Sequence, residues 1–178
     1  MMTIEELIAN IRTVPDYPME GILFYDVTTL FKNPEALHTI VERTYERYKD
    51  KGITKVVGIE SRGFVLGSAL AVKLGAGFVL ARKPGKLPAD TVSESYHKEY
   101  GKDTVEIHLD AITPDDVVLV HDDLLATGGT VGAVNRLVRR FNPKAVYDNF
   151  IIELPALNGR KHIPEGTPVT ALLALEGD

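Results

Sequence analysis

The sequence has no cysteine and no tryptophan among its 178 residues, and only 7% of its residues are aromatic. The lack of cysteine excludes disulfides, thiolate catalysis and Cys-ligated zinc or iron–sulfur sites. No stretch approaches the roughly 20 apolar residues that a membrane-spanning helix needs. The acidic, amphipathic start MMTIEELIAN also differs from a secretory signal, in which a basic region precedes an apolar one. We therefore expect a cytoplasmic protein with no membrane partner.

The sequence has fewer basic than acidic residues: 20 lysines and arginines and 25 aspartates and glutamates give a net charge of -5. This balance argues against a nucleic-acid partner, and at first sight it also disfavours a polyanionic substrate. The hydrophobic (44%) and charged (25%) fractions are those of a folded globular protein. A chain of this length is expected to form a single domain, residues 1–178.

The pattern of apolar residues predicts an α/β fold. Near the N-terminus, Thr3 and Glu6 form a capping box for a short helix, and Asn33-Pro34 starts a second helix. Strand and helix signals then alternate, with strands expected at 55–59, 78–81, 105–108, 116–121, 145–154 and 169–175, and helices at 64–74 and 129–141. This alternation is typical of a mainly parallel central sheet flanked by helices. Residues 19–26 are expected to form a loop, and residues 83–103 a long polar excursion.

Ligands of such sheets bind beyond the carboxyl ends of the strands, and the strongest functional signal lies there. We expect the strand that contains DVVLVH to end in Asp122 and Asp123, after which a small-residue turn opens a helix. The turn residues whose N–H groups can form an anion-binding nest are Ala126, Thr127, Gly128, Gly129 and Thr130. The acid pair suits a sugar diol, a hydrated Mg²⁺, or both. The alternative is a capped helix start with two solvent-facing aspartates.

The block VLVHDDLLATGGT resembles the phosphoribosyl-diphosphate signature of the type I phosphoribosyltransferases. Further segments resemble the adenine-specific branch of that family, in order and at the expected spacing: GIESRGFVLG (58–67), RKPGKLP (82–88), SESYHKEYG (93–101), IIELPALNGR (151–160) and the N-terminal stretch 15–34. The resemblance covers essentially the whole chain. It implies a type I phosphoribosyltransferase-like fold with a small N-terminal hood (roughly 1–34) and a flexible catalytic loop, or lid (roughly 87–104).

The resemblance also implies an activity, which is a Mg²⁺-dependent step of purine salvage. Adenine and phosphoribosyl diphosphate would give AMP and diphosphate, through an oxocarbenium-like displacement at C1′ of the ribose. Positive charge would then build on the sugar and negative charge on the leaving group, so the enzyme must stabilise both. The family is further expected to form homodimers, in which the counterpart of Arg82 reaches the neighbouring subunit's site.

The family's site residues map onto this sequence position by position. The nest would hold the 5′-phosphate, while Asp122 and Asp123 would bind the ribose hydroxyls and, mostly through water and substrate, Mg²⁺. The residues expected to bind the diphosphate are Ser61, Arg62, Arg82, Lys83 and Lys86, which concentrate positive charge despite the acidic total. Arg62 and the two aspartates are counted as catalytic together with Glu99, the expected acid/base near purine N7. The alternatives are a solvated basic turn at 82–86 and an exposed loop glutamate.

Tyr100 would pack or hydrogen-bond in the closed lid. The base is expected to contact Leu23, Phe24, Tyr25 and Leu125, with Phe24 stacking on the ring; for Leu23, a purely structural role in pinning the loop is an equal alternative.

Three positions depart from the family pattern. Position 25 is usually Arg, Glu20 replaces a frequent Pro, and His121 stands where an apolar residue usually precedes the acid pair. For His121 we favour a structural role over titration near neutral pH. Tyr25 keeps open a second hypothesis, transfer to another purine such as hypoxanthine, guanine or xanthine. A third hypothesis is a non-catalytic regulator that binds phosphoribosyl diphosphate or a nucleotide, although the chain shows no added DNA-binding segment or basic face.

Overall fold

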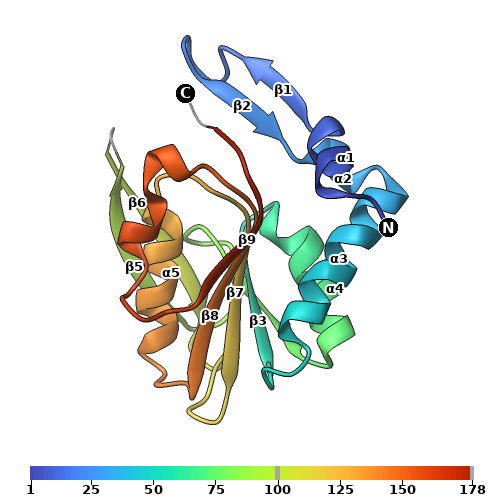
Figure 1. The fold of residues 1–178 in the computed structure, drawn as a ribbon. Coiled ribbons are helices and arrows are strands. Elements are labelled where there is room, and N and C mark those ends of the chain that lie inside the picture. The colour runs from blue at the N-terminus through green and yellow to red at the C-terminus, as the bar shows by residue number, and fades with distance from the viewer. Residues whose placement is uncertain (99–100, 177–178) are drawn as a thin grey trace.

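The computed structural model describes residues 1–98 and 101–176 and shows the expected α/β architecture (Figure 1). The central sheet has the strand order β4-β3-β7-β8-β9, and all its neighbouring strands are parallel. Its strands are β3 (Lys55–Ile59), β4 (Gly77–Ala81), β7 (Val117–Leu125), β8 (Ala145–Glu153) and β9 (Val169–Ala174). Within the described residues, no helix is long and apolar enough to cross a membrane.

Helices cover both faces of this sheet, as the buried-strand pattern requires. The long helices are α3 (Pro34–Tyr48), α4 (Gly63–Leu74) and α5 (Gly129–Arg139). Val118 and Val120 of the central strand β7 pack in one cluster with α5, whereas Leu119 packs on the other face with Tyr48 of α3 and Ala71 of α4. Because successive residues of a strand point to opposite faces, one apolar run serves both cores.

The predicted helix starts are confirmed. In α1 (Ile4–Ala9), the Thr3 hydroxyl accepts from the backbone N–H of Glu6, while the Glu6 carboxylate accepts from the backbone N–H of Thr3 at 2.7 Å. Asn33 caps α3 with its side-chain oxygen, ahead of Pro34 in the first turn. These caps satisfy backbone donors that a helix cannot pair internally.

The prediction of a loop over residues 19–26 is partly wrong. Residues Leu23–Asp26 form strand β2, which pairs antiparallel with β1 (Arg12–Pro15) to make a hairpin beside the short helices α1 and α2 (Thr28–Phe31). Figure 1 shows the hairpin of this N-terminal hood extending beyond the main sheet, while Leu7 of α1 and Leu30 of α2 pack in one cluster with Leu66 of α4. A two-stranded ribbon with a proline in one strand carries little alternation, so its sequence pattern is weak.

The second half of the predicted polar excursion over residues 83–103 is regular, and the returning strand predicted at 105–108 is confirmed as part of β6. Strands β5 (Thr91–Lys98) and β6 (Gly101–His108) pair antiparallel over their whole length, and we call this hairpin the arm. The arm lies against α5, where Glu94 forms ion pairs with Arg136 and Arg140. Much of the segment expected to be the lid therefore forms a hairpin that contacts α5. Two one-turn helices, η1 (Pro155–Leu157) and η2 (Gly159–His162), follow β8.

Candidate active site

The acid pair lies inside β7 and not beyond its end, because β8 continues to offer backbone partners as far as Leu125. Arg62, at the start of α4, binds the second acid: its Nε donates to Asp123 Oδ2 at 2.5 Å. Asp123 is buried, and Asp122 is partly exposed. Burial, together with the negative charge of Asp123, raises the pKa of Asp122 well above its usual value. A cation on the open side of the pair would favour the ionised form of both acids.

The small-residue turn, where we predicted the nest, lies at the start of α5. Gly128 has a φ of +84°, and a Cβ there would lie 2.1 Å from the carbonyl oxygen of Gly159. A Cβ on Gly129 would lie 3.1 Å from the ring of Tyr96. At position 128, the positive φ and the close approach to Gly159 both require glycine. A cavity of about 100 Å³ opens beside the turn, lined by Asp122, Leu124, Leu125, Ala126, Thr127, Gly128, Gly129, Thr130, Val131 and Phe150.

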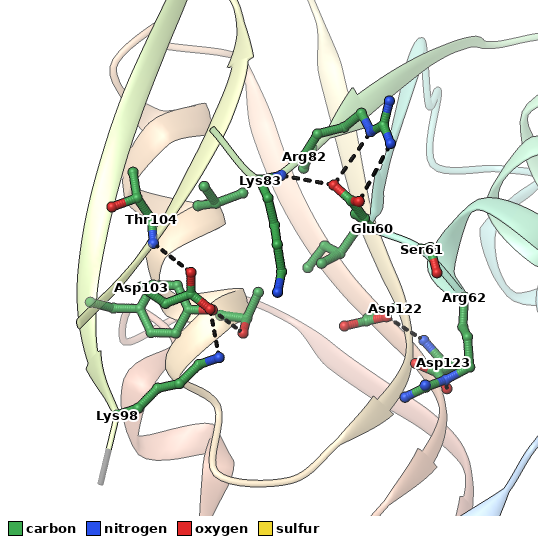
Figure 2. A pocket seen from close by; sticks show the side chains of 15 residues that line it. Glu60, Ser61, Arg62, Arg82, Lys83, Lys98, Asp103, Thr104, Asp122 and Asp123 are labelled. Atoms are coloured by element: carbon green, nitrogen blue, oxygen red, sulfur yellow. Dashed lines mark hydrogen bonds and ion pairs between the residues drawn. The ribbon is translucent and has the colours of Figure 1, made fainter. Parts of the chain in front are cut away.

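A second, larger cavity of about 250 Å³ lies between the arm and the ends of β3, β4 and β7 (Figure 2). We call it the main pocket. The predicted site residues that line it are Ser61, Arg62, Arg82, Lys83, Asp122, Asp123 and Thr130. Asp122 and Thr130 line both cavities, so the nest and the main pocket adjoin. Lys86 is exposed and does not line the main pocket; its carbonyl oxygen accepts a hydrogen bond from Arg82.

Residues that the sequence analysis did not assign also line the main pocket: Ile59, Glu60, Ala81, Tyr96, Lys98, Asp103, Thr104 and Val105. Glu60, which directly precedes the predicted Ser61-Arg62 loop, contacts the second predicted cationic loop. Its carboxylate accepts from the backbone N–H of Lys83 at 2.8 Å and pairs with Arg82 at 3.3 Å. The sequence carried a signal for this contact, because the acidic residue Glu60 directly follows the apolar run of β3. The arm residues fall within the predicted lid, but their individual placement depends on hairpin pairing and carried no signal of its own.

The predicted base-binding side chains do not share one face of the hood. The Phe24 ring lies edge-on to Tyr17 at 5.1 Å, and the Arg62 guanidinium sits 5.8 Å from its centre. Tyr25 packs against the apolar cluster that contains Leu30 of α2 and Ile151 of β8. Its hydroxyl donates to the carbonyl oxygen of Glu176 at 2.5 Å. Alternation along β2 puts Leu23 on the same side as Tyr25. The unusual Tyr25 therefore has a structural partner near the C-terminus.

His121 behaves as the structural interpretation expects. The residue has no exposed surface, and its Nδ1 lies 2.9 Å from Oδ1 of Asn149. Burial lowers the pKa of His121 to about 4, so it stays neutral at physiological pH. The predicted acid/base Glu99 and the lid residue Tyr100 lie outside the described residues. Their neighbour Lys98 lines the main pocket.

Comparison with known proteins identifies the class. Residues 26–161 match the phosphoribosyl transferase domain family, so the chain belongs to the phosphoribosyltransferases with the type I fold.

Within that family the chain groups with the adenine phosphoribosyltransferases. It is 66% identical over 174 residues to the adenine phosphoribosyltransferase of Phocaeicola vulgatus, covering 98% of this chain and 100% of the relative. The crystal structure of the Rhodothermus marinus adenine phosphoribosyltransferase matches with a TM-score of 0.91 at 53% identity, over 97% of this chain and 98% of that one. The Giardia lamblia enzyme, solved with 9-deazaadenine, matches with a TM-score of 0.93 at 41% identity, over 99% of each chain.

Proposed function

We propose that this chain joins adenine to phosphoribosyl diphosphate, giving AMP and diphosphate. The observation that carries the proposal is that the nest and the main pocket adjoin at Asp122 and Thr130. Two anion sites on either side of an acid pair fit a sugar that carries phosphate at both ends. Adenine as the acceptor is supported by the relatives, which are named for it and align over nearly the whole chain.

The chemistry follows from these positions. The bond between ribose C1′ and the diphosphate oxygen breaks, with its electron pair leaving on diphosphate, and the purine nitrogen forms the new bond to C1′. We assign the 5′-phosphate to the nest and the 2′- and 3′-hydroxyls to Asp122 and Asp123. The carboxylates then lie where positive charge develops on the sugar. Arg62 and Lys83 would hold the departing diphosphate.

Mg²⁺ fits this donor set. Two adjacent carboxylates offer oxygen ligands of the kind that Mg²⁺ prefers. The described residues contain no cluster of three potential metal-ligating side chains, so substrate oxygens and water would complete the coordination. When bound, the ion would neutralise charge on the diphosphate.

Glu99 is proposed to handle the purine proton near N7, as the general acid/base on the arm. Phe24 is proposed as the stacking partner of the base, since its ring lies beside Arg62 at the mouth of the site. The Tyr25 side chain packs on the other side and bonds to Glu176, so it gives no support to a different purine.

We further propose a homodimer in the cytoplasm. Exposed apolar side chains occur on α4 and on the edge strand β4: Val65 is 44% exposed, Val72 83% and Leu80 38%. An apolar surface of this kind favours association with a second copy. It is continuous with Arg82, which follows β4 directly.

The test is to incubate the protein with phosphoribosyl diphosphate, Mg²⁺ and one purine at a time, and to identify the nucleotide formed. We expect AMP and diphosphate from adenine, and loss of the reaction when EDTA removes the metal. Tight binding of phosphoribosyl diphosphate without AMP formation would favour the regulator hypothesis. IMP, GMP or XMP formation in preference to AMP would favour another base.

A further inference from the structure

We propose that Lys98, on the arm, is a diphosphate-binding residue that Asp103 holds in place until the anion arrives. The proposal rests on the proposed function and extends it, because it adds a cation to the leaving-group site from an element outside the predicted diphosphate loops. Figure 2 shows Lys98 and Lys83 reaching toward the same space from different sides of the main pocket.

The arm places Lys98 by strand alternation. Tyr96 and Lys98 share one face of β5, and Asp103 of β6 is the cross-strand partner of Tyr96 on that face. The Tyr96 hydroxyl lies 2.8 Å from Oγ1 of Thr130, which anchors this face of the arm to the nest. Lys98 Nζ lies 2.5 Å from Asp103 Oδ2 and 5.9 Å from the centre of the Tyr96 ring. The ammonium group is therefore held at the pocket wall and not extended into solvent.

The contact with Asp103 is of a kind that a stronger anion can displace. The Lys98 side chain is 50% exposed, and an ion pair in that environment is weak. Asp103 would keep other donors after the exchange, since it accepts from the backbone N–H of Thr104 at 2.9 Å and from the Tyr96 hydroxyl at 3.3 Å. No buried carboxylate would be left unpaired. A diphosphate carries several negative charges against the single charge of Asp103, so it competes well for the ammonium.

A diphosphate in the main pocket would be stabilised by a further cation. Arg62 also pairs with Asp123, and Arg82 pairs with Glu60, so part of the positive charge of both guanidiniums is already compensated. Lys98 adds a cation to this pocket from the arm.

The chain offers a matched control on the same hairpin. Lys102 pairs across the strands with His97, on the opposite face of the arm, and does not line the main pocket. We would compare Lys98→Met with Lys102→Met and the wild type. Steady-state rates would be measured with varied phosphoribosyl diphosphate and then with varied adenine.

Because a charge-assisted hydrogen bond is lost, we expect Lys98→Met to raise KM for phosphoribosyl diphosphate about tenfold and to leave KM for adenine nearly unchanged. Lys102→Met should change neither constant by more than about twofold. Lys98→Arg should restore most of the affinity. Equal values for the two methionine variants would overturn the proposal, as would an equal rise in both KM values.

A binding measurement separates this proposal from the proposed function. Calorimetric titration with phosphoribosyl diphosphate and Mg²⁺, without a base, should show the same tenfold difference in Kd. If the wild type binds phosphoribosyl diphosphate but forms no AMP, the proposed function fails while a weaker Kd of Lys98→Met still supports the role of Lys98. If the wild type does not bind it, both proposals fail.

Discussion

A buried acid on β8 leads to a prediction about stability. Asp148 has no exposed surface, and both its carboxylate oxygens lie 3.0 Å from the same amide nitrogen of Asn135. Burial raises the pKa of Asp148 to about 7 from 3.8, against the opposing effects of Asn135 and Arg139. Asn135 Oδ1 is buried without a partner among the described residues. One amide donor shared by both carboxylate oxygens offsets little of the cost of burying a charge, so the neutral acid suits the site better.

The sign of the pH effect follows from proton linkage. Between the unfolded pKa of 3.8 and the folded value of about 7, the folded chain holds a proton that the unfolded chain has released. The free energy of unfolding therefore falls as pH rises through this range. Roughly three pKa units correspond to about 4 kcal/mol once the acid is fully ionised. Asp148→Asn removes this contribution, so relative to wild type the variant should gain up to about 4 kcal/mol above pH 7 and little near pH 4.

Urea unfolding followed by circular dichroism, at pH values from about 4 to 8, measures this difference. Asp110→Asn is the control, because Asp110 is exposed and should give a constant, small difference. A difference between Asp148→Asn and wild type that does not change with pH would refute the reasoning.

Three further predictions concern the site. Asp123→Asn and Glu99→Gln should each lower kcat by a factor on the order of 100 while circular dichroism shows an intact fold, and unchanged kcat values would remove the assigned roles. Gly128→Ala forces a Cβ to within 2.1 Å of the Gly159 carbonyl oxygen, so we expect a loss of roughly 1–3 kcal/mol in urea unfolding and weaker binding of phosphoribosyl diphosphate; wild-type values for both would contradict the close approach. Phe24→Ala should raise KM for adenine more than KM for phosphoribosyl diphosphate, and the reverse order would place the base elsewhere.

The central sheet could be read from the sequence because its strands are buried on both faces. Runs such as DVVLVH are apolar without alternation and are bounded by turn residues, which is a strong local signal. The capping residues Thr3 and Asn33 likewise act within one helical turn, so their effect is visible in the sequence. The turn between β7 and α5 was also readable, since its run of small residues marks a strand–helix junction.

The two hairpins could not be read in the same way. The strands of the arm are partly exposed and polar, so their structure depends on pairing between residues 91–98 and 101–108 and on the ion pairs of Glu94 with α5. The contribution of Asp103 and Lys98 to the main pocket exists only once that pairing is formed. Tyr25 illustrates the same limit, because its partner Glu176 is 151 residues away along the chain.

The central claim is that this site transfers phosphoribosyl groups to adenine. The most direct measurement is the ratio of kcat/KM for adenine to that for hypoxanthine, with Mg²⁺ and saturating phosphoribosyl diphosphate. A site that recognises the adenine edge by hydrogen bonds should reject hypoxanthine by a factor of at least about 100. We expect such a ratio, with AMP as the product. Comparable values for the two bases, or a preference for hypoxanthine, would contradict the account.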